Sequence, residues 1–238
     1  MTLERREFQT TKGTVVLSGD FKGNRPIVVV IRGAYADAEM FAPLQTILLE
    51  ARVLFGEIPG NRCPLLSEQS VEAYRVAYSE ALSRLDGPVI VCGLSLGGVI
   101  ALGLTCSTFA ILAIDPPMRP AESVVLQKVM RTAFKKSEDE VDRKFLEEIF
   151  LSDNEYMPPA SRLLCPTVVL AGDHVGTIPS VLSDGTFEEL GRLPMVTTER
   201  VPGVGHSVWI GGSARIVEVL RKLSTIEHNQ KRPAGTSA

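Results

Sequence analysis

A tight turn between an apolar strand and an apolar helix constrains this chain more than any other feature. Residues 89–103 read VIVCGLSLGGVIALG, so Ser95 lies where a β-branched run gives way to a helical one. Gly93 and Gly97 flank it two positions away on each side, which leaves room for strand and helix to approach each other. The pattern predicts a strained turn that projects Ser95 beyond the end of a strand, beside a helix N-terminus.

Continuous apolar runs alternate with helical segments along the rest of the chain. Runs such as IVVVIRG at residues 27–33 are typical of strands buried on both faces of a parallel sheet. The helical segment at 67–85 begins with Ser67 as its expected N-cap. This alternation favours a doubly wound, mostly parallel α/β sheet with a leading antiparallel strand. Further strands are expected at residues 13–19, 52–60, 87–93, 109–115, 166–173 and 197–203, and further helices at 37–51 and 96–106.

The segment from about 116 to 159 interrupts this alternation. It holds two charged helical patterns between DPPMRP and MPPA, and prolines at both ends are typical of an insertion. We expect a short helical cap inserted after the sixth strand, over the crevice where such sheets bind ligands; a long crossover connection is the alternative. Residues 1–223 then form a single domain, followed by a polar tail at 224–238 that we expect to be disordered.

Composition and motifs argue against several classes of function. The 238 residues carry a formal net charge of −3 and no basic stripe, so nucleic-acid binding is not expected. Neither an apolar run of membrane-spanning length nor a signal-peptide pattern occurs, so we expect a cytoplasmic protein without a membrane partner. The four cysteines form no CxxC pair, and no dinucleotide-binding or phosphate-loop motif occurs. We therefore expect no cofactor, metal site or disulfide framework.

A serine hydroxyl needs a histidine base to act as a nucleophile at neutral pH. Of the three histidines, His206 lies in a glycine-flanked loop, VPGVGHSVW, after the last expected strand and before the final helix. His174 directly follows a strand, and His228 belongs to the tail. A late loop of this kind can reach the carboxyl edge of the sheet, where Ser95 is expected. His206 is therefore the predicted general base.

Several elements together resemble the α/β-hydrolase superfamily, in particular its esterase and lipase-like branch with a small helical cap. They are the motifs RG, EIPG, GLSLGG, LAGDHVGTIP and GVGHSVW, spread over residues 14–223. The resemblance implies a catalytic serine, histidine and acid. It also implies an oxyanion hole made of the Leu96 N–H and an N–H from the loop after an early strand, which by position belongs to Ala34, with Tyr35 as second choice.

The sequence departs from this family's pattern at two positions. Arg32 stands where a histidine usually precedes the glycine, and its guanidinium is expected either to pair with a substrate carboxylate or to hydrogen-bond nearby carbonyls. The usual acid position, in register with Gly172 and Pro179, is occupied by Val175. Valine cannot accept a hydrogen bond from the imidazole, so the acid has to come from elsewhere.

Two other carboxylates are candidates for the acid. Asp173 follows the same strand two residues before Val175, and an extended backbone points both side chains the same way. Asp115 ends the preceding strand in LAIDPP, and some family members place their acid after that strand. Both stay open from the sequence, as does a third option in which no carboxylate contacts His206 and the enzyme is slow.

These residues predict a serine hydrolase that cleaves a small or medium ester or thioester through an acyl-enzyme on Ser95. Its partner is a small-molecule acyl substrate, and cap residues such as Met118, Met130 and Phe134 are expected to set specificity. The same scaffold also hosts acyl transfer, peptide cleavage at proline and carbon–carbon bond cleavage.

Two other classes of function compete with this interpretation. A non-catalytic binding protein on a hydrolase fold is motivated by Val175 and Arg32, although such a protein has no need of the serine turn or the late histidine. A metal-dependent hydrolase would use Asp173 and His174 as ligands, but the chain shows no HxH or HExxH spacing.

Overall fold

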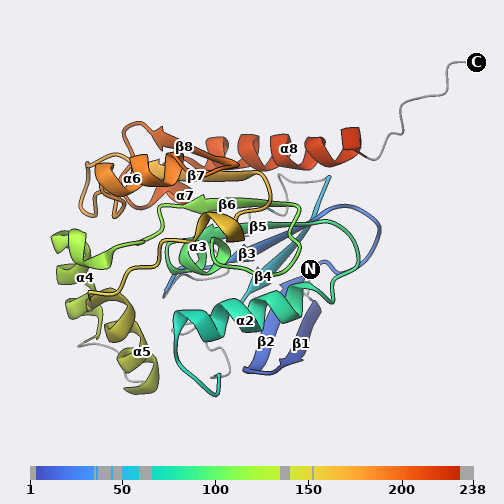
Figure 1. Ribbon diagram of the computed structural model, residues 1–238, viewed down its shortest axis with the longest axis horizontal. Coiled ribbons are helices and arrows are strands. Elements are labelled where there is room, and N and C mark those ends of the chain that lie inside the picture. The colour runs from blue at the N-terminus through green and yellow to red at the C-terminus, as the bar shows by residue number, and fades with distance from the viewer. Residues whose placement is uncertain are drawn as a thin grey trace, which may run out of the picture.

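The chain folds around one sheet. A computed structural model describes residues 4–34, 36, 44, 50–58, 66–134, 140–151 and 153–230. The sheet has eight strands in the order β1-β2-β4-β3-β5-β6-β7-β8 (Figure 1). The β1–β2 and β2–β4 pairs are antiparallel, and the other pairs are parallel. The strands are β1 Glu4–Thr10, β2 Gly13–Gly19, β3 Ile27–Ile31, β4 Arg52–Gly56, β5 Val89–Leu94, β6 Ala110–Ile114, β7 Thr167–Gly172 and β8 Val196–Val201.

The central strands come from the apolar runs of the sequence. Every residue of β3, β4, β5 and β6 is buried, as parallel strands covered on both faces require. Val29 of β3 pairs with Leu54 of β4 on one side and with Val91 of β5 on the other. The predicted fold class, a doubly wound and mostly parallel α/β sheet, is confirmed.

Helices cover both faces of this sheet. The helices within the described residues are α2 Val71–Leu82, α3 Leu96–Ala101, α4 Val124–Phe134, α5 Glu140–Leu151, α6 Asp184–Gly191, α7 Val208–Gly211 and α8 Ser213–Gln230, with 3-10 turns η2 Pro120–Glu122 and η3 Ala160–Arg162. Helices α2 and α3 share one apolar core with one face of the sheet, through residues such as Tyr74 and Val99. Helix α8 packs on the opposite face through Ile216 and Leu220 (Figure 1).

The chain reverses its direction of growth between β3 and β5. It passes from β3 outward to β4, then returns to place β5 on the other side of β3 and continues through β6, β7 and β8. Ligands bind at the carboxyl ends of strands at such a switch point. Arg32, Gly33 and Ala34 follow β3 and Ser95 follows β5, so these residues lie at this edge of the sheet.

Strand β1 was not predicted. Its sequence, ERREFQT, is mostly charged and exposed, so it carries no apolar signal. It forms because it pairs along its whole length with β2, from Glu4 opposite Gly19 to Thr10 opposite Gly13. Charged side chains on such an edge strand discourage pairing with other chains.

The N-terminus of α2 differs from the prediction. The helix begins at Val71 with Ser70 as its N-cap, and the Ser70 side chain accepts the N–H of Ala73. Ser67 instead donates to the carbonyl of Lys12, in the turn between β1 and β2. The helix expected at 37–51 lies almost wholly outside the described residues.

Helix α8 also runs further than predicted. Residues 224–230 continue this helix, so the expectation of disorder from residue 224 is wrong for them. The buried residues Leu220 and Leu223 anchor the preceding turn, and each further residue then adds a hydrogen bond to a helix already nucleated. The rest of the expected tail, 231–238, lies outside the described residues.

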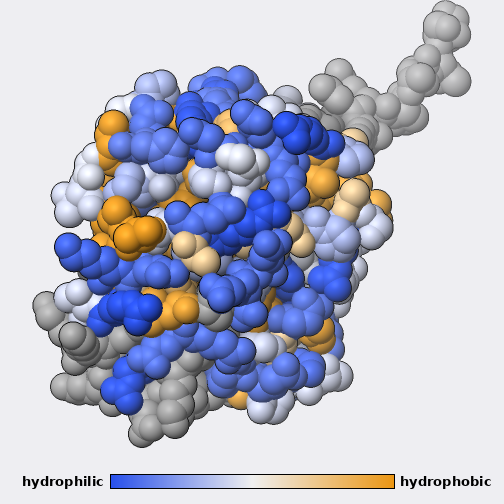
Figure 2. All heavy atoms as spheres, turned by 60° about the vertical axis from the view of Figure 1, so that its left-hand side comes forward, coloured by the Kyte–Doolittle hydropathy of each residue, from blue (hydrophilic) through white to orange (hydrophobic). Residues whose placement is uncertain are grey.

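Helices α4 and α5 lie between β6 and β7, within the segment expected to form a cap, and occupy one side of the molecule (Figure 1). Figure 2 turns this side forward and shows hydrophobic residues in small separate groups among hydrophilic ones. Among the described residues, no helix is both long and apolar enough to span a bilayer.

Candidate active site

Ser95 occupies the turn that joins β5 to α3. Its backbone has φ 49° and ψ −117°, a conformation that a non-glycine residue adopts under strain. The Ser95 N–H donates to the carbonyl of Ile114 at 2.9 Å, and the Gly98 N–H donates to the Ser95 carbonyl at 2.8 Å. A strained serine at the carboxyl end of a central strand, directly before a helix, has the geometry of a nucleophile elbow.

Two glycines allow this turn to form. A Cβ on Gly97 would overlap the backbone of Ile31 and Arg32 at the end of β3. A Cβ on Gly93 would overlap the backbone of Gly97 and of the next residue. Strand, turn and helix therefore approach as closely as backbone atoms permit.

We expect Gly97→Ala to destabilise the fold, because the added methyl group meets only backbone. Overpacking of this kind costs about 1–3 kcal/mol. Gly185→Ala in α6 is the matched control, since nothing lies within 4 Å of a Cβ at Gly185 and alanine is the better helix former. Thermal unfolding should show a lower midpoint for Gly97→Ala and an unchanged or higher one for Gly185→Ala. Equal midpoints for Gly97→Ala and the parent protein would contradict the close approach.

His206 lies in the loop between β8 and α7 and is 8% exposed. Its N–H donates to the carbonyl of Ile178 at 2.8 Å. Gly205 lets this loop dock, because a Cβ there would overlap the carbonyl oxygens of Val175 and Ile178. The ring of Trp209 stands nearly perpendicular to the imidazole, with an interplanar angle of 86° and ring centroids 5.6 Å apart. These contacts fix the position of the His206 loop.

Asp115 is the carboxylate that contacts His206. Asp115 Oδ2 lies 2.7 Å from His206 Nδ1. The aspartate is completely buried after β6, with φ 42°. Because an ionised carboxylate only accepts hydrogen bonds, Nδ1 carries the hydrogen, and Nε2 is then the nitrogen able to take up a proton. This is the tautomer that a general base requires.

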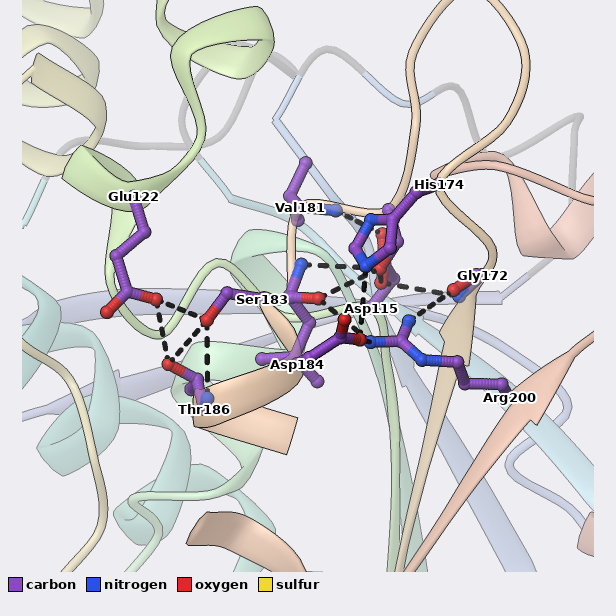
Figure 3. A network of polar contacts seen from close by, with 11 residues as sticks. Asp115, Glu122, Gly172, His174, Val181, Ser183, Asp184, Thr186 and Arg200 are labelled. Carbon is purple, nitrogen blue, oxygen red and sulfur yellow. Dashed lines mark hydrogen bonds and ion pairs between the residues drawn. The ribbon is translucent and has the colours of Figure 1, made fainter. Parts of the chain in front are cut away.

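Three further groups hold the Asp115 carboxylate. Ser180 Oγ donates to Oδ1 at 2.6 Å, the Val181 N–H to Oδ2 at 3.0 Å and the Gly172 N–H to Oδ1 at 3.4 Å. Figure 3 shows the contacts from Val181 and Gly172 converging on Asp115. A buried carboxylate needs such donors, and together they fix its orientation. Neither Ser180 nor Val181 stands out in the sequence, because both reach Asp115 only through tertiary contact.

Asp173 has a different partner. Its Oδ2 accepts the N–H of Gly203 at 2.7 Å, and Gly203 has φ 73°, so the aspartate stabilises the turn after β8. Val175, at the usual acid position, is 44% exposed. Of the two carboxylates left open by the sequence, the structure brings Asp115 and not Asp173 to His206.

Ser95 and His206 line one cavity of about 250 Å³. Gly33 and Ala34, in the turn after β3, line the same cavity. Leu96 is the first residue of α3 and directly follows Ser95, so its N–H belongs to a helix N-terminus. The two N–H groups expected to form an oxyanion hole therefore come from the turn after β3 and the start of α3, at the ends of the adjacent strands β3 and β5. Tyr35, the second choice for the donor after β3, lies outside the described residues.

The helices between β6 and β7 supply an apolar wall of this cavity. Leu126 and Met130 of α4 and Phe150 of α5 all line it. Met118, named as a specificity residue from the sequence, is instead fully buried and is not among the residues that line this cavity. The side chain of Phe134 lies outside the described part of the chain.

Arg32 hydrogen-bonds carbonyls, which is the second of the two roles expected for it. The residue is 3% exposed. Its Nη1 donates to the carbonyl of Ala36 at 3.1 Å, and its Nη2 pairs with the carboxylate of Glu57. Arg32 is not among the residues that line the cavity.

Other reactive groups lie apart from the cavity. Cys92 of β5 is buried, and burial raises the pKa of its thiol to about 12, so it stays protonated at neutral pH. His174 Nε2 lies 3.2 Å from a carboxylate oxygen of Asp184, which also pairs with Arg200 (Figure 3). Among the residues that the structure describes, no three His, Cys, Asp or Glu side chains gather closely enough to hold a metal ion.

Comparison with known proteins finds similar solved structures but no related sequence. No family model matches the chain, and no curated protein sequence matches it either. A carboxylesterase from Bacillus subtilis matches with a TM-score of 0.67 and 16% identity, over 94% of this chain and 92% of that one. An N-acyl homoserine lactonase variant complexed with N-hexanoyl homoserine gives a TM-score of 0.70 and 15% identity, over 98% and 100%. An esterase from Exiguobacterium antarcticum gives 0.67 and 14%, over 93% and 100%. The chain therefore has the α/β-hydrolase fold that its motifs resemble.

Proposed function

We propose that this protein is a serine hydrolase that cleaves small or medium neutral esters through an acyl-enzyme on Ser95. The observation that carries the proposal is the hydrogen bond between buried Asp115 and His206, 2.7 Å long, beside a cavity that His206 shares with the strained Ser95. A nucleophile, a base and an orienting carboxylate are the three groups that acyl transfer requires. The structural neighbours that are named as esterases and a lactonase support the same class of chemistry.

In the proposed mechanism, Ser95 Oγ attacks the ester carbonyl while His206 Nε2 takes the hydroxyl proton. Asp115 stabilises the imidazolium that forms. The N–H groups of Leu96 and Ala34 hold the oxyanion of the tetrahedral intermediate. The intermediate collapses as His206 returns the proton to the leaving alcohol or thiol. A water molecule, deprotonated by His206, then attacks the acyl-enzyme, releases the carboxylic acid and restores the serine hydroxyl.

The cavity favours a neutral, apolar acyl group. Its walls include Leu126, Met130 and Phe150, and the guanidinium of Arg32 is engaged by Glu57 rather than directed at a substrate. At about 250 Å³ the cavity is near the small end of the range for ligand sites, about 300–1,000 Å³. We expect turnover of p-nitrophenyl acetate, butyrate and hexanoate, and none of the palmitate. Absence of turnover on all four esters would contradict the proposal.

Met130→Trp should shift the preference toward short acyl groups. The larger side chain fills part of the cavity that Met130 lines. We expect the ratio of kcat/KM for hexanoate to that for acetate to fall about tenfold, since a methylene that no longer fits is worth about 1–3 kcal/mol. Val124→Trp on the same helix is the matched control, because Val124 is 77% exposed. An unchanged ratio in Met130→Trp would show that the acyl group binds elsewhere.

The rival interpretation, a non-catalytic binding protein, rested on Val175 at the usual acid position and on Arg32 in place of the usual histidine. Asp115 supplies a carboxylate to His206 from another strand, so the absence of an acid at Val175 no longer argues against catalysis. Hydrolysis is distinguished from acyl transfer by adding methanol to the assay: a transferase accumulates the methyl ester, whereas a hydrolase releases mainly the free acid.

A further inference from the structure

Arg32 is a charged side chain enclosed at the end of β3. It is 3% exposed and directly follows the last residue of that strand. Taking an arginine out of water costs free energy unless a counter-charge and hydrogen-bond acceptors replace the water. Glu57, immediately after β4, supplies the counter-charge. The burial of Arg32 therefore depends on specific partners, which lie in two segments: the end of β4 and the turn after β3.

The guanidinium joins the end of β4 to the turn that follows β3. Nε makes a long hydrogen bond of 3.5 Å to the carbonyl of Gly56, the last residue of β4. Nη1 donates to the carbonyl of Ala36 at 3.1 Å. A planar guanidinium presents its donors in a fixed fork, so these bonds and the Glu57 pair set the position of Ala36 relative to β4.

The turn held in this way contains the expected oxyanion donor. The N–H of Ala36 donates to the carbonyl of Gly33 at 3.1 Å and closes the turn. Gly33 packs directly on the nucleophile, because a Cβ at this position would lie 3.2 Å from Ser95 Cβ. Ala34 lies between these two ends and lines the cavity. Its peptide is therefore oriented by Ser95 at one end of the turn and by Arg32 at the other.

We propose that Arg32 is a positioning residue that holds Ala36, and with it Gly33 and Ala34, so that the Ala34 N–H faces the developing oxyanion. This inference rests on the proposed function, because it concerns the transition state of that reaction. Arg32 acts through the backbone of the turn and does not contact substrate. An oxyanion donor contributes to rate only when it is already aimed at the place where charge develops, so loosening the turn slows the chemical step without weakening substrate binding.

The test compares Arg32→Lys with Arg52→Lys. Lysine keeps the charge at either position but lacks the fork that reaches several acceptors at once. Arg52 is the matched control, because it is also buried, at 6% exposed, and donates to the carbonyls of Phe21, Arg25 and Asp86. It lies at the start of β4, opposite Ile27, so it is at the far end of the sheet from Ser95.

Three quantities are measured for each variant: kcat and KM on p-nitrophenyl butyrate, the inhibition constant of an alkyl trifluoromethyl ketone, and the thermal midpoint. The ketone forms a tetrahedral adduct on an active serine and thus reports on the oxyanion hole. For Arg32→Lys we expect kcat to fall by about tenfold or more, KM to stay within about twofold and ketone binding to weaken in parallel with kcat. Arg52→Lys should lower the thermal midpoint and leave the other values near those of the parent.

Several results would overturn the proposal. Equal kcat losses in both variants would mean that lost stability explains the effect. A KM increase confined to anionic esters in Arg32→Lys would mean that the guanidinium contacts substrate. If Arg32→Lys does not fold, Glu57→Ala releases the guanidinium from the other side and should lower kcat in the same manner; an unchanged kcat overturns the proposal. An active parent with an unaltered Arg32→Lys refutes this inference alone, whereas a parent without turnover refutes the proposed function as well.

Discussion

Replacement of Ser95 by alanine is expected to lower kcat by about 10⁶-fold, as loss of a nucleophilic serine does in a serine protease. The reason is chemical, because the substitution removes the attacking oxygen itself. The fold should be preserved, since Ser95 makes no side-chain capping bond to α3 and alanine meets the same backbone strain as serine. Steady-state kinetics on p-nitrophenyl butyrate measure the loss of kcat, and a thermal melt checks that the fold is preserved.

The double variant Ser95→Ala, His206→Ala serves as the control for this result. Residues that act as one unit are strongly non-additive, so we expect the double variant to be no slower than Ser95→Ala. A further loss in the double variant would mean that His206 acts in a step that does not involve Ser95. Full activity of Ser95→Ala would remove the serine from the mechanism.

Asp115→Asn is expected to lower kcat by about 10⁴-fold, because an asparagine that donates its amide hydrogen to Nδ1 selects the wrong imidazole tautomer. Asparagine is suited to this position, since it tolerates positive φ better than most residues and Asp115 has φ 42°. The KM should change little, because the carboxylate is completely buried and makes no contact with substrate in the proposed mechanism.

Asp173→Asn is the matched control for Asp115→Asn. Asp173 lies at the end of the adjacent strand and accepts the N–H of Gly203, a bond that the asparagine oxygen can also accept. We expect kcat to stay within about twofold of the parent, as for substitutions away from the reacting groups. A large loss in Asp173→Asn together with a small one in Asp115→Asn would reverse the assignment of the acid.

The elements best predicted from the sequence are those specified by a pattern of neighbouring residues. The serine turn requires glycine at positions 93 and 97, where a Cβ would overlap backbone, and this requirement is visible in the sequence itself. The central strands are equally visible, because a strand buried on both faces has to be apolar throughout. Strand β1 carried no such signal, since its pairing with β2 is made by backbone groups.

The acid was not predictable because the decisive contacts are tertiary. Asp115 and Asp173 directly follow the neighbouring strands β6 and β7, so both lie at the carboxyl edge of the sheet. The choice between them depends on the path of the loop at 202–206. Asp173 accepts the N–H of Gly203 at the start of that loop. The imidazole of His206, at the end of the loop, contacts Asp115 instead.

Long-range contacts decided two smaller features as well. Ser67 and Ser70 are chemically equal as candidate caps, but Ser67 is engaged by the carbonyl of Lys12, 55 residues away. The sequence allowed Arg32 either a substrate contact or bonds to carbonyls, and only the position of Glu57 and Ala36 decides between them. Local pattern therefore specified the serine turn, and tertiary packing specified the contacts of His206 and Arg32.

Covalent labelling tests the proposal that Ser95 is an activated nucleophile. The purified protein is treated with a fluorophosphonate at neutral pH, and the adduct is located by intact-mass and peptide mass spectrometry. We expect one adduct per chain, on Ser95, in the parent and in Asp173→Asn, and none in Ser95→Ala or His206→Ala. Cys92 should stay unmodified, because burial raises the pKa of its thiol to about 12. No adduct on the parent protein, or an adduct that persists in Ser95→Ala, would mean that Ser95 is not an activated nucleophile.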